Sequence, residues 1–363
     1  MAREVLENQL GGQFCKKRRE SGTELLRIIA ACMVVWLHVT LPWGIKTASG
    51  GLNLFLVHVF EVIAIPAVDI FILISGYFMV NKKQRTIGKP ISLLIQLMTF
   101  KFLFFGIECI LQYPTIPFEN SIVLPNDYFI TLYIALYFIS PYINKAIDGL
   151  TKQQCKTLLI TSAIILSIYP ILWDYMNLYT GSQVSGVSTV SRWHEDTGQN
   201  IVTFALLYIV GALMNKMQIE QFVSKQRALA IWLITSLVLL GVYLLDERFT
   251  NDVYGSVSLF YHNPLVVLQA ASLFLFFKHI KFKSKLINSL AAAAFTCYLA
   301  HGHILKYLKI DSFLQGTPLM LILYYIVIAA SIYLVSYILY LVYNFATQRL
   351  FNKLDRVTIT YYT

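Results

Sequence analysis

Charged residues are scarce in this sequence. They make up 13% of the 363 residues, whereas 57% are hydrophobic and the mean hydropathy is +0.62. So few charges exclude a soluble globular domain as the main structure and predict a protein that crosses a membrane several times. The longest predicted connection, about residues 177–198, is too short for a domain and suits either an ordinary solvated loop or an entrance loop.

Paired cysteines and internal repeats are also missing. The five cysteines are odd in number and show no paired spacing, so they predict neither a disulfide framework nor a metal site. Two late histidines, His301 and His303, are two residues apart and point to different sides of a helix, which a metal pair at i and i+4 would not. We therefore expect one membrane unit without a bound metal.

Acidic residues are fewer than basic ones, which gives the chain a net charge of +10. In a soluble protein this excess would suggest nucleic-acid binding. Here the basic residues form short clusters between apolar runs, and membrane topology is the simpler explanation. The lipid bilayer, rather than a nucleic acid, is the expected partner.

Ten apolar runs predict an all-α integral membrane protein, a bundle of about ten transmembrane helices. Residues 1–22 precede a ten-span membrane domain at 23–346, and residues 347–363 form a tail. The first run is too long for a signal-peptide core and lacks a clear cleavage site, so we expect it to remain as a span. Pro66 is expected to kink the second run. The predicted spans are residues 23–43, 53–80, 91–112, 127–146, 156–176, 199–215, 227–245, 256–277, 286–307 and 317–346.

Lysine and arginine are distributed unevenly between the two predicted sides. Arg27 and Lys101 lie within spans. Of the others, 22 fall on the side of the two termini and the alternate loops, and 5 fall on the opposite side. Short cytoplasmic loops are enriched in Lys and Arg, so the bias predicts that both termini are cytoplasmic and that the number of spans is even.

The first span carries two ionisable side chains. Arg27 and His38 are eleven residues apart, so they lie on one stripe of the helix, about 16 Å apart along its axis. Ionisable groups in a span usually face a bundle interior or a watery cavity and mark functional sites. In a purely structural alternative, Arg27 snorkels to the interface and His38 bonds to a neighbouring carbonyl.

The second span carries three more ionisable residues. His58 and Asp69 repeat the spacing of eleven, and Glu61 lies one turn from His58. Because consecutive spans each present such groups on one face, we expect the faces to oppose each other and line a common cavity. Counting from the shared outer loop puts His58 and Glu61 level with His38, and Asp69 level with Arg27.

A basic cluster containing Lys83 and Arg85 follows the second span. Positive-inside anchoring explains such a cluster without any ligand. The same side chains would also suit the phosphates of an anionic cofactor that arrives from the cytosol. The sequence alone leaves both explanations open.

Several elements, taken in order along the chain, resemble the integral-membrane acyltransferase family 3. They are the Arg27 to His38 element, the IPAVDIFILISGYFM segment that closes the second span, the basic pair Lys83 and Arg85, the YFITLYIALYFISPYI stretch and the late CYLAH. The resemblance covers essentially the whole chain, and it rests on the order and spacing of these elements rather than on any one of them.

This resemblance implies a multi-pass enzyme of the bacterial cytoplasmic membrane. A ten-span core would take an acyl group, usually acetyl, from cytosolic acyl-coenzyme A and deliver it to a hydroxyl at or beyond the outer face. The acceptor would be a surface polysaccharide, a lipid-linked saccharide or a related molecule. By similarity His38 would be the essential histidine, Arg27 its partner on the same helix, and Lys83 and Arg85 the basic pair that binds the cofactor.

His38 is the best candidate for the base that activates the acceptor hydroxyl, since histidine is largely neutral near pH 7. Glu61 could orient it while Asp69 holds Arg27, which makes Asp69 a further catalytic candidate. Glu61 and His301 are candidates for binding the substrate, and the base would be His301 or Asp69 if His38 proved structural. Direct transfer and a transient acyl-histidine both remain open.

A transporter or flippase is the competing function, because it would also need charged residues along a cavity. The sequence shows no pair of Gly- or Pro-interrupted helices in matching halves and no internal symmetry. A purely structural or sensory membrane protein would leave the ionisable stripes without an explanation.

Overall fold

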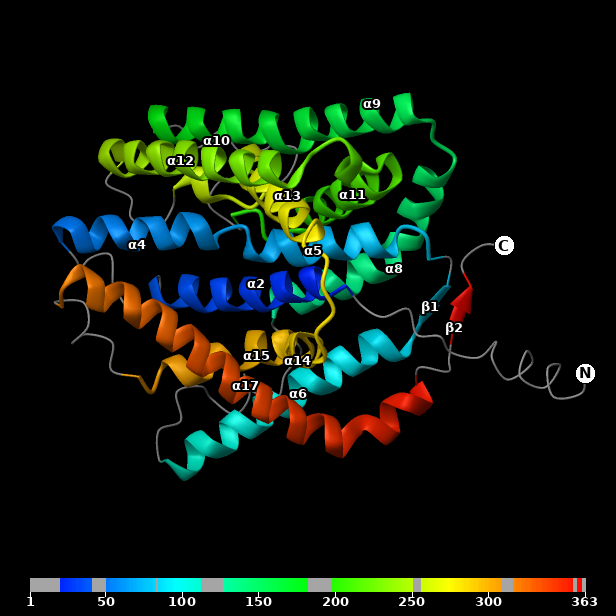
Figure 1. The fold of residues 1–363 in the computed structure, drawn as a ribbon, viewed down its shortest axis with the longest axis vertical. Coiled ribbons are helices and arrows are strands. Elements are labelled where there is room, and N and C mark those ends of the chain that lie inside the picture. Colours follow the sequence, from blue (N-terminus) through cyan, green and yellow to red (C-terminus); the bar gives the residue numbers. More distant parts are fainter. Residues whose placement is uncertain are drawn as a thin grey trace, which may run out of the picture.

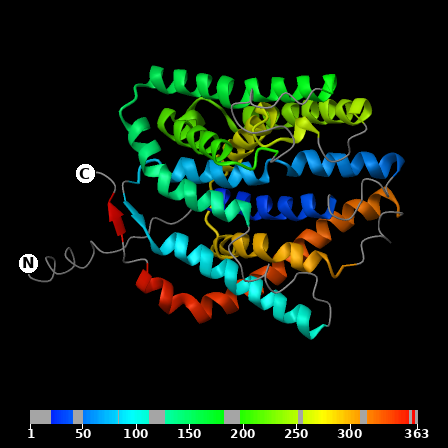
Figure 2. The same ribbon diagram turned by 180° about the vertical axis from the view of Figure 1, so that it is seen from behind.

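The computed structural model of the chain describes residues 20–40, 50–82, 84–111, 127–181, 197–250, 256–308, 316–354 and 358–360. In these residues the chain is almost entirely helical, and most helices run along one common direction (Figure 1). The view from behind shows the same bundle (Figure 2). The predicted all-α architecture is confirmed.

Each predicted span coincides with helical structure. Eight helices in the described part of the chain are long and apolar enough to cross a membrane. The sixth predicted span is a shorter apolar helix of 17 residues, and the ninth consists of three short helical segments in succession. The protein is therefore a multi-pass membrane protein. The segments are α2 (Ser21–Thr40), α4 (Gly51–Ala64), α5 (Ala67–Met79), α6 (Gly88–Ile110), α8 (Tyr128–Asp148), α9 (Lys152–Ala163), η1 (Ile164–Ile168), α10 (Tyr169–Thr180), α11 (Ile201–Met217), η2 (Ile219–Gln221), α12 (Lys225–Thr250), η3 (Val257–Leu259), α13 (Pro264–Lys278), α14 (Lys285–Leu290), η4 (Ala291–Ala293), α15 (Ala294–Leu305) and α17 (Pro318–Leu354), with two short strands, β1 (Gln84–Thr86) and β2 (Thr358–Thr360).

The first span, α2, lies at the centre of the bundle. It packs against α4, α5, α13, α14, α15 and α17, and both ribbon views show it between α5 and α15 (Figures 1 and 2). Leu26 and Ala30 are fully buried on it. A polar side chain on α2 therefore needs a hydrogen-bond partner in the protein or a cavity that holds water, because bulk water does not reach the centre of the bundle.

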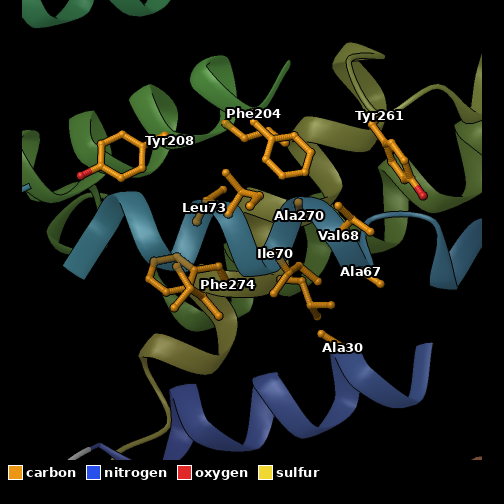
Figure 3. Close-up of a cluster of buried hydrophobic side chains, with 14 of the residues drawn as sticks. Ala30, Ala67, Val68, Ile70, Leu73, Phe204, Tyr208, Tyr261, Ala270 and Phe274 are labelled. Atoms are coloured by element: carbon orange, nitrogen blue, oxygen red, sulfur yellow. The ribbon is translucent and has the colours of Figure 1, made fainter. Parts of the chain in front are cut away.

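Close packing of α5 against α11 builds the adjoining core. A Cβ atom on Gly76 would collide with the carbonyl of Tyr208, and one on Gly211 would collide with the carbonyl of Leu73. Small residues at such crossings let helix backbones approach, which is how helices gain packing energy in a membrane. Figure 3 shows Leu73 of α5 beside Tyr208 and Phe204 of α11, with Ala30 of α2 on the opposite side of α5.

Prolines account for three irregularities in the helices. The second span breaks at Pro66, as the sequence predicts, so that α4 and α5 are separate helices. Pro141 lies inside α8 and cannot donate to the carbonyl of Tyr137, which accepts the hydroxyl of Ser140 at 2.9 Å instead. The π-helical turn η1 directly precedes α10, whose second residue is Pro170. This turn was not predicted, although a missing N–H donor favours such a bulge.

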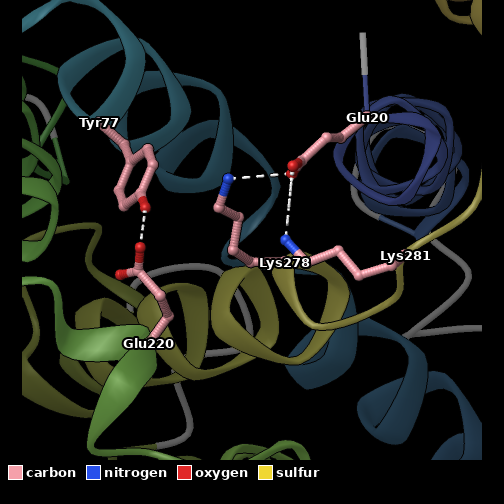
Figure 4. Close-up of polar contacts among 5 residues, drawn as sticks. All are labelled: Glu20, Tyr77, Glu220, Lys278 and Lys281. Atoms are coloured by element: carbon pink, nitrogen blue, oxygen red, sulfur yellow. Dashed lines mark hydrogen bonds and ion pairs between the residues drawn. The ribbon is translucent and has the colours of Figure 1, made fainter. Parts of the chain in front are cut away.

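Ion pairs connect the start of α2 to the end of α13 at one end of the bundle. The Glu20 carboxylate receives Lys278 Nζ at 3.0 Å and Lys281 Nζ at 3.4 Å (Figure 4). Partial burial alone would raise the pKa of Glu20, but the hydrogen bonds and charges of the two lysines hold it below its ordinary value. Nearby, the Tyr77 hydroxyl of α5 donates to Glu220 at 2.5 Å. We call this the inner end, because the charge count predicts that it faces the cytoplasm.

Two strands join distant parts of the chain at the inner end. Strand β1, after the second span, pairs antiparallel with β2, after the last, with Gln84 opposite Thr360 and Thr86 opposite Thr358. These segments therefore share one end of the bundle, as an even number of spans requires. The predicted tail boundary at residue 346 is not a helix end, because α17 remains apolar to Leu350 and continues to Leu354.

Candidate active site

Two cavities lie end to end beside α2. The inner cavity has a volume of about 450 Å³ and extends from Arg27 and the inner end toward the middle of the bundle. The outer cavity, of about 430 Å³, contains His38. Three residues line both cavities and form the boundary between them: Val34 of α2, Val68 of α5 and Tyr298 of α15. The predicted stripe of α2 thus faces open space at both of its ionisable residues.

The outer cavity brings two histidines together. His38, in the last turn of α2, and His301, on α15, have ring centroids 4.4 Å apart with their planes at 72°. His38 is exposed to the cavity, whereas His301 is almost fully buried. The pair comes from residues more than 260 positions apart in the chain, so neither helix alone could reveal it.

Hydrogen bonds orient both imidazoles in the same way. Nδ1 of His38 lies 2.9 Å from the carbonyl oxygen of Val34, and Nδ1 of His301 lies 2.6 Å from that of Tyr298. A carbonyl oxygen only accepts, so in each neutral ring Nδ1 carries the hydrogen and Nε2 keeps a lone pair. Nε2 of His301 has no hydrogen-bond partner among the described atoms. The site therefore offers two basic nitrogens close together.

Asp127 and Tyr298 form a second polar contact at the cavity wall. The Tyr298 hydroxyl donates to the Asp127 carboxylate, 2.9 Å from Oδ1 and 3.0 Å from Oδ2. Asp127 is also the N-cap of α8, where it accepts the N–H of Ile130 at 2.9 Å. Neither residue was predicted as a site residue from the sequence, although an Asp directly before an apolar helical run is a recognisable N-cap signal.

The inner cavity combines cations with apolar walls. Arg27 of α2, Lys82 after α5 and Lys89 at the start of α6 line it, and the rest of the wall is mostly apolar and aromatic. The Arg27 guanidinium pairs with Glu24 at 2.6 Å and stays 30% exposed. Lys82 and Lys89 were not singled out in the sequence, where they looked like the rest of the basic cluster.

The second span does not turn its outer half toward His38, and this prediction was wrong. Glu61 accepts the hydroxyl of Tyr243 at 2.6 Å, and His58 Nε2 lies 3.0 Å from Glu247 Oε2. Both partners belong to α12. Glu61 therefore does not orient His38, and its place outside the two cavities gives no support to the predicted role in substrate binding.

Asp69 and Arg27 do not form the predicted pair. Asp69 is fully buried on α5, and neither of its carboxylate oxygens has a hydrogen-bond partner among the described atoms. Arg27 has Glu24 as its partner instead, which lies three residues earlier on the same helix. The proposed catalytic role of Asp69 thus has no contact with Arg27 to support it, and it remains a prediction.

The basic pair after the second span is only partly described, because Lys83 lies outside the described residues. The guanidinium of Arg85 is buried and donates to the carbonyls of Lys82 and Met79, at 3.0 and 3.4 Å, and to the Ser140 hydroxyl at 3.3 Å. These bonds attach the end of the second span to α8. They favour a structural role for Arg85 over the predicted contact with a cofactor.

A buried polar cluster holds the outer segment that carries Tyr261, another residue of the outer cavity. His262 is fully buried with its Nε2 3.5 Å from Asp174, and its carbonyl accepts Ser167 at 2.6 Å. The sequence around His262 gave no sign of this contact. The contacts of His262 hold the neighbouring Tyr261 in the wall of the outer cavity.

Comparison with known proteins identifies the family. The family model described as "Acyltransferase domain" matches residues 21–341, which includes every residue of both cavities. No curated protein and no solved structure shows significant similarity to the chain. The match covers most of the chain and confirms the resemblance drawn from its motifs. The chain belongs to acyltransferase family 3 and is a membrane acyltransferase.

Proposed function

We propose that this chain is a membrane O-acyltransferase, most simply an O-acetyltransferase, of the bacterial cytoplasmic membrane. It would move an acyl group from cytosolic acyl-coenzyme A to a hydroxyl of an envelope saccharide or a lipid-linked saccharide. One observation carries the proposal: the two cavities meet end to end, with three cationic side chains in the inner one and the facing imidazoles of His38 and His301 in the outer one.

The inner cavity fits the donor. Coenzyme A has an anionic, phosphate-bearing head and a long pantetheine arm that ends in the thioester. Lys82 and Lys89 lie at the inner end, where phosphates would arrive, and Lys and Arg are the side chains that bind phosphate. Arg27 is deeper, and about 16 Å of helix separates it from His38, a distance that an extended arm would bridge. Apolar walls suit the arm.

The residues of the outer cavity suit the acyl-transfer reaction itself. Nε2 of His38 would take the proton of the acceptor hydroxyl while the oxygen attacks the thioester carbonyl carbon. The carbon–sulfur bond breaks, and the imidazolium returns the proton to the leaving thiolate, so that coenzyme A departs as the thiol. His301 offers a second lone pair 4.4 Å away, ring to ring, which suits binding of the acceptor hydroxyl. If an acyl-histidine forms, the same lone pair of His38 would attack the thioester carbonyl and the carbon–sulfur bond would break to release the thiolate of coenzyme A. The acceptor hydroxyl would then take the acyl group from the imidazole, and its proton would pass to the thiolate.

Inside-out membrane vesicles test the proposal. Vesicles that contain the chain are sealed around an envelope saccharide fraction and are then given radiolabelled acetyl-coenzyme A from the medium, and the label on the saccharide is measured. We expect label with the wild-type chain and almost none with an equally abundant His38→Ala chain. Transport of a solute without any acetylated acceptor would contradict the proposal and support the transporter function. Label that stays on the denatured wild-type protein when no acceptor is added would indicate the acyl-histidine route.

A further inference from the structure

Asp127 is fixed at the wall of the outer cavity by two kinds of contact. Its Oδ1 accepts the N–H of Ile130 at the start of α8, and both of its oxygens lie within hydrogen-bond distance of the Tyr298 hydroxyl. It shares the cavity with His38. The carboxylate is therefore held in one place on the wall of the cavity that contains His38, although the two residues are far apart in the sequence.

The negative charge exceeds what helix capping needs. Asn and Ser cap helices about as well as Asp, and a partly buried carboxylate costs free energy unless a positive charge compensates for it. Lys101 of α6 is close enough to interact electrostatically with Asp127 and supplies part of that compensation. Asp127 also interacts electrostatically with His38.

We propose that Asp127 is a positioning residue that supplies the counter-charge for His38 during the proposed acyl transfer. His38 becomes a cation when it takes the proton of the acceptor hydroxyl, and the Asp127 carboxylate stabilises that cation through the cavity. The proton then passes to the leaving thiolate, and Asp127 itself stays ionised. Unlike the aspartate of a hydrolytic triad, it does not bond to the ring, because Nδ1 of His38 is already bonded to Val34.

Tyr298 links this charge to the boundary between the cavities. Its hydroxyl bonds to Asp127 while its ring lines both cavities, so the two residues hold each other in place. The charged and titratable groups that share the outer cavity with His38 are His301, His303, Lys306, Asp127, Tyr128, Tyr261 and Tyr298. Among the described residues that line this cavity, Asp127 is the only carboxylate. The Glu108 carboxylate of α6 pairs with His303 and Lys306 of the cavity wall, so removing the charge of Asp127 leaves His38 without a carboxylate in the described lining.

The test compares Asp127→Asn with Tyr298→Phe. Asn keeps the N-cap and an acceptor for Tyr298 but removes the charge, whereas Phe removes the hydroxyl and keeps the charge. Because a unit charge in a partly screened site changes a rate or an equilibrium roughly 10- to 100-fold, we expect kcat of Asp127→Asn to fall by that factor. The acid limb of the pH dependence of kcat/KM should move to lower pH, because an imidazole without a nearby negative charge loses its proton more readily. In Tyr298→Phe the limb should stay in place.

An acid limb that does not move in Asp127→Asn would overturn this role, provided that the wild-type chain transfers acetyl. Failure of the proposed function would look different, because the wild-type chain would then transfer no acetyl at all. If Asp127→Asn is not recovered as a folded protein, Asp127→Ser removes the same charge and also keeps a capping oxygen. Size-exclusion chromatography in detergent establishes that each variant is folded before its pH profile is measured.

Discussion

The neighbouring helices α2 and α4 both carry ionisable side chains, but these side chains have different surroundings. On α2, Arg27 and His38 each line a cavity. On α4, His58 and Glu61 are buried against Glu247 and Tyr243 of α12. Both helices satisfy the rule that a membrane span buries an ionisable group only with a partner or water.

The two helices differ in whether their ionisable side chains still have an atom available to bind a ligand. His38 lines the outer cavity and keeps the lone pair of Nε2, since among the described residues only its Nδ1 has a hydrogen-bond partner. The carboxylate of Glu61 already accepts a hydrogen bond from the hydroxyl of Tyr243. The ring of His58 packs against the ring of Tyr243, with their centroids 5.1 Å apart. In these two helices, an ionisable residue that borders a cavity is a candidate for catalysis, whereas one that does not forms a structural contact between helices.

Removing the imidazole of His38 should have the largest effect on activity, and it tests the difference between α2 and α4. His38→Gln keeps a hydrogen-bonding side chain but cannot accept a proton at neutral pH, so we expect kcat to fall roughly 10²–10⁴-fold at normal expression. His38→Ala should be no more active. Acetyl transfer in membranes of matched protein content provides the measurement. If His38→Gln kept near-normal turnover, the histidine would be structural like His58, and the distinction between α2 and α4 would disappear.

The contact between α4 and α12 should matter for stability rather than chemistry. Tyr243→Phe keeps the ring but leaves the buried Glu61 carboxylate without this donor, which should reduce the free energy of unfolding by about 1–3 kcal/mol. Melting of the purified protein in detergent measures this change, and kcat at a permissive temperature should stay close to wild type. Tyr169→Phe, which removes a more exposed hydroxyl from α10, is the matched control. A stable Tyr243→Phe protein with a lost kcat would place the α4 contact in the active site.

Smaller effects are expected from the lysines of the inner cavity. Lys82→Gln and Lys89→Gln should each raise the KM for acetyl-coenzyme A roughly fivefold with little change in kcat, because an exposed ion pair contributes up to about 1 kcal/mol. Lys283→Gln removes a lysine from the same end of the bundle that does not line the cavity, and it is the control. Equal KM values in all three variants would reduce the inner cations to determinants of topology.

The smallest kinetic effect is expected for Arg85. Arg85→Lys cannot reproduce the fork of bonds to the Met79 carbonyl and the Ser140 hydroxyl, so the melting temperature should fall while the KM for the donor stays the same. The two quantities are measured on one preparation. A raised KM with unchanged melting would restore the sequence-based expectation that Arg85 binds the donor.

Sequence patterns predicted the spans and the faces of single helices. Each apolar run is long enough to require a helix, and a spacing of eleven residues is enough to place Arg27 and His38 on one stripe. The break at Pro66 follows from a missing N–H in the same way. These are local properties, so they can be derived without knowing which helices are neighbours.

The partners of each stripe could not be predicted. The stripe of α4 faces α12, whose Tyr243 is 182 residues away from Glu61, rather than the helix that precedes it in the chain. His301 contacts the ring of His38, and Asp127 lines the same cavity; they belong to two further elements. Periodicity says which residues share a face, but the packing of the whole bundle decides what that face meets, and such contacts depend on side-chain fit throughout the bundle.

The pairing of β1 with β2 also sets an order for biogenesis. About 270 residues separate the two strands, and ribosomes add roughly 5–20 residues per second, so β1 waits on the order of tens of seconds for its partner. The helices that close both cavities are made during that interval. The pairing of β1 with β2 therefore forms after the helices around both cavities have been made, and a ribosome stalled before residue 358 would hold an inserted bundle whose β1 segment is not yet paired.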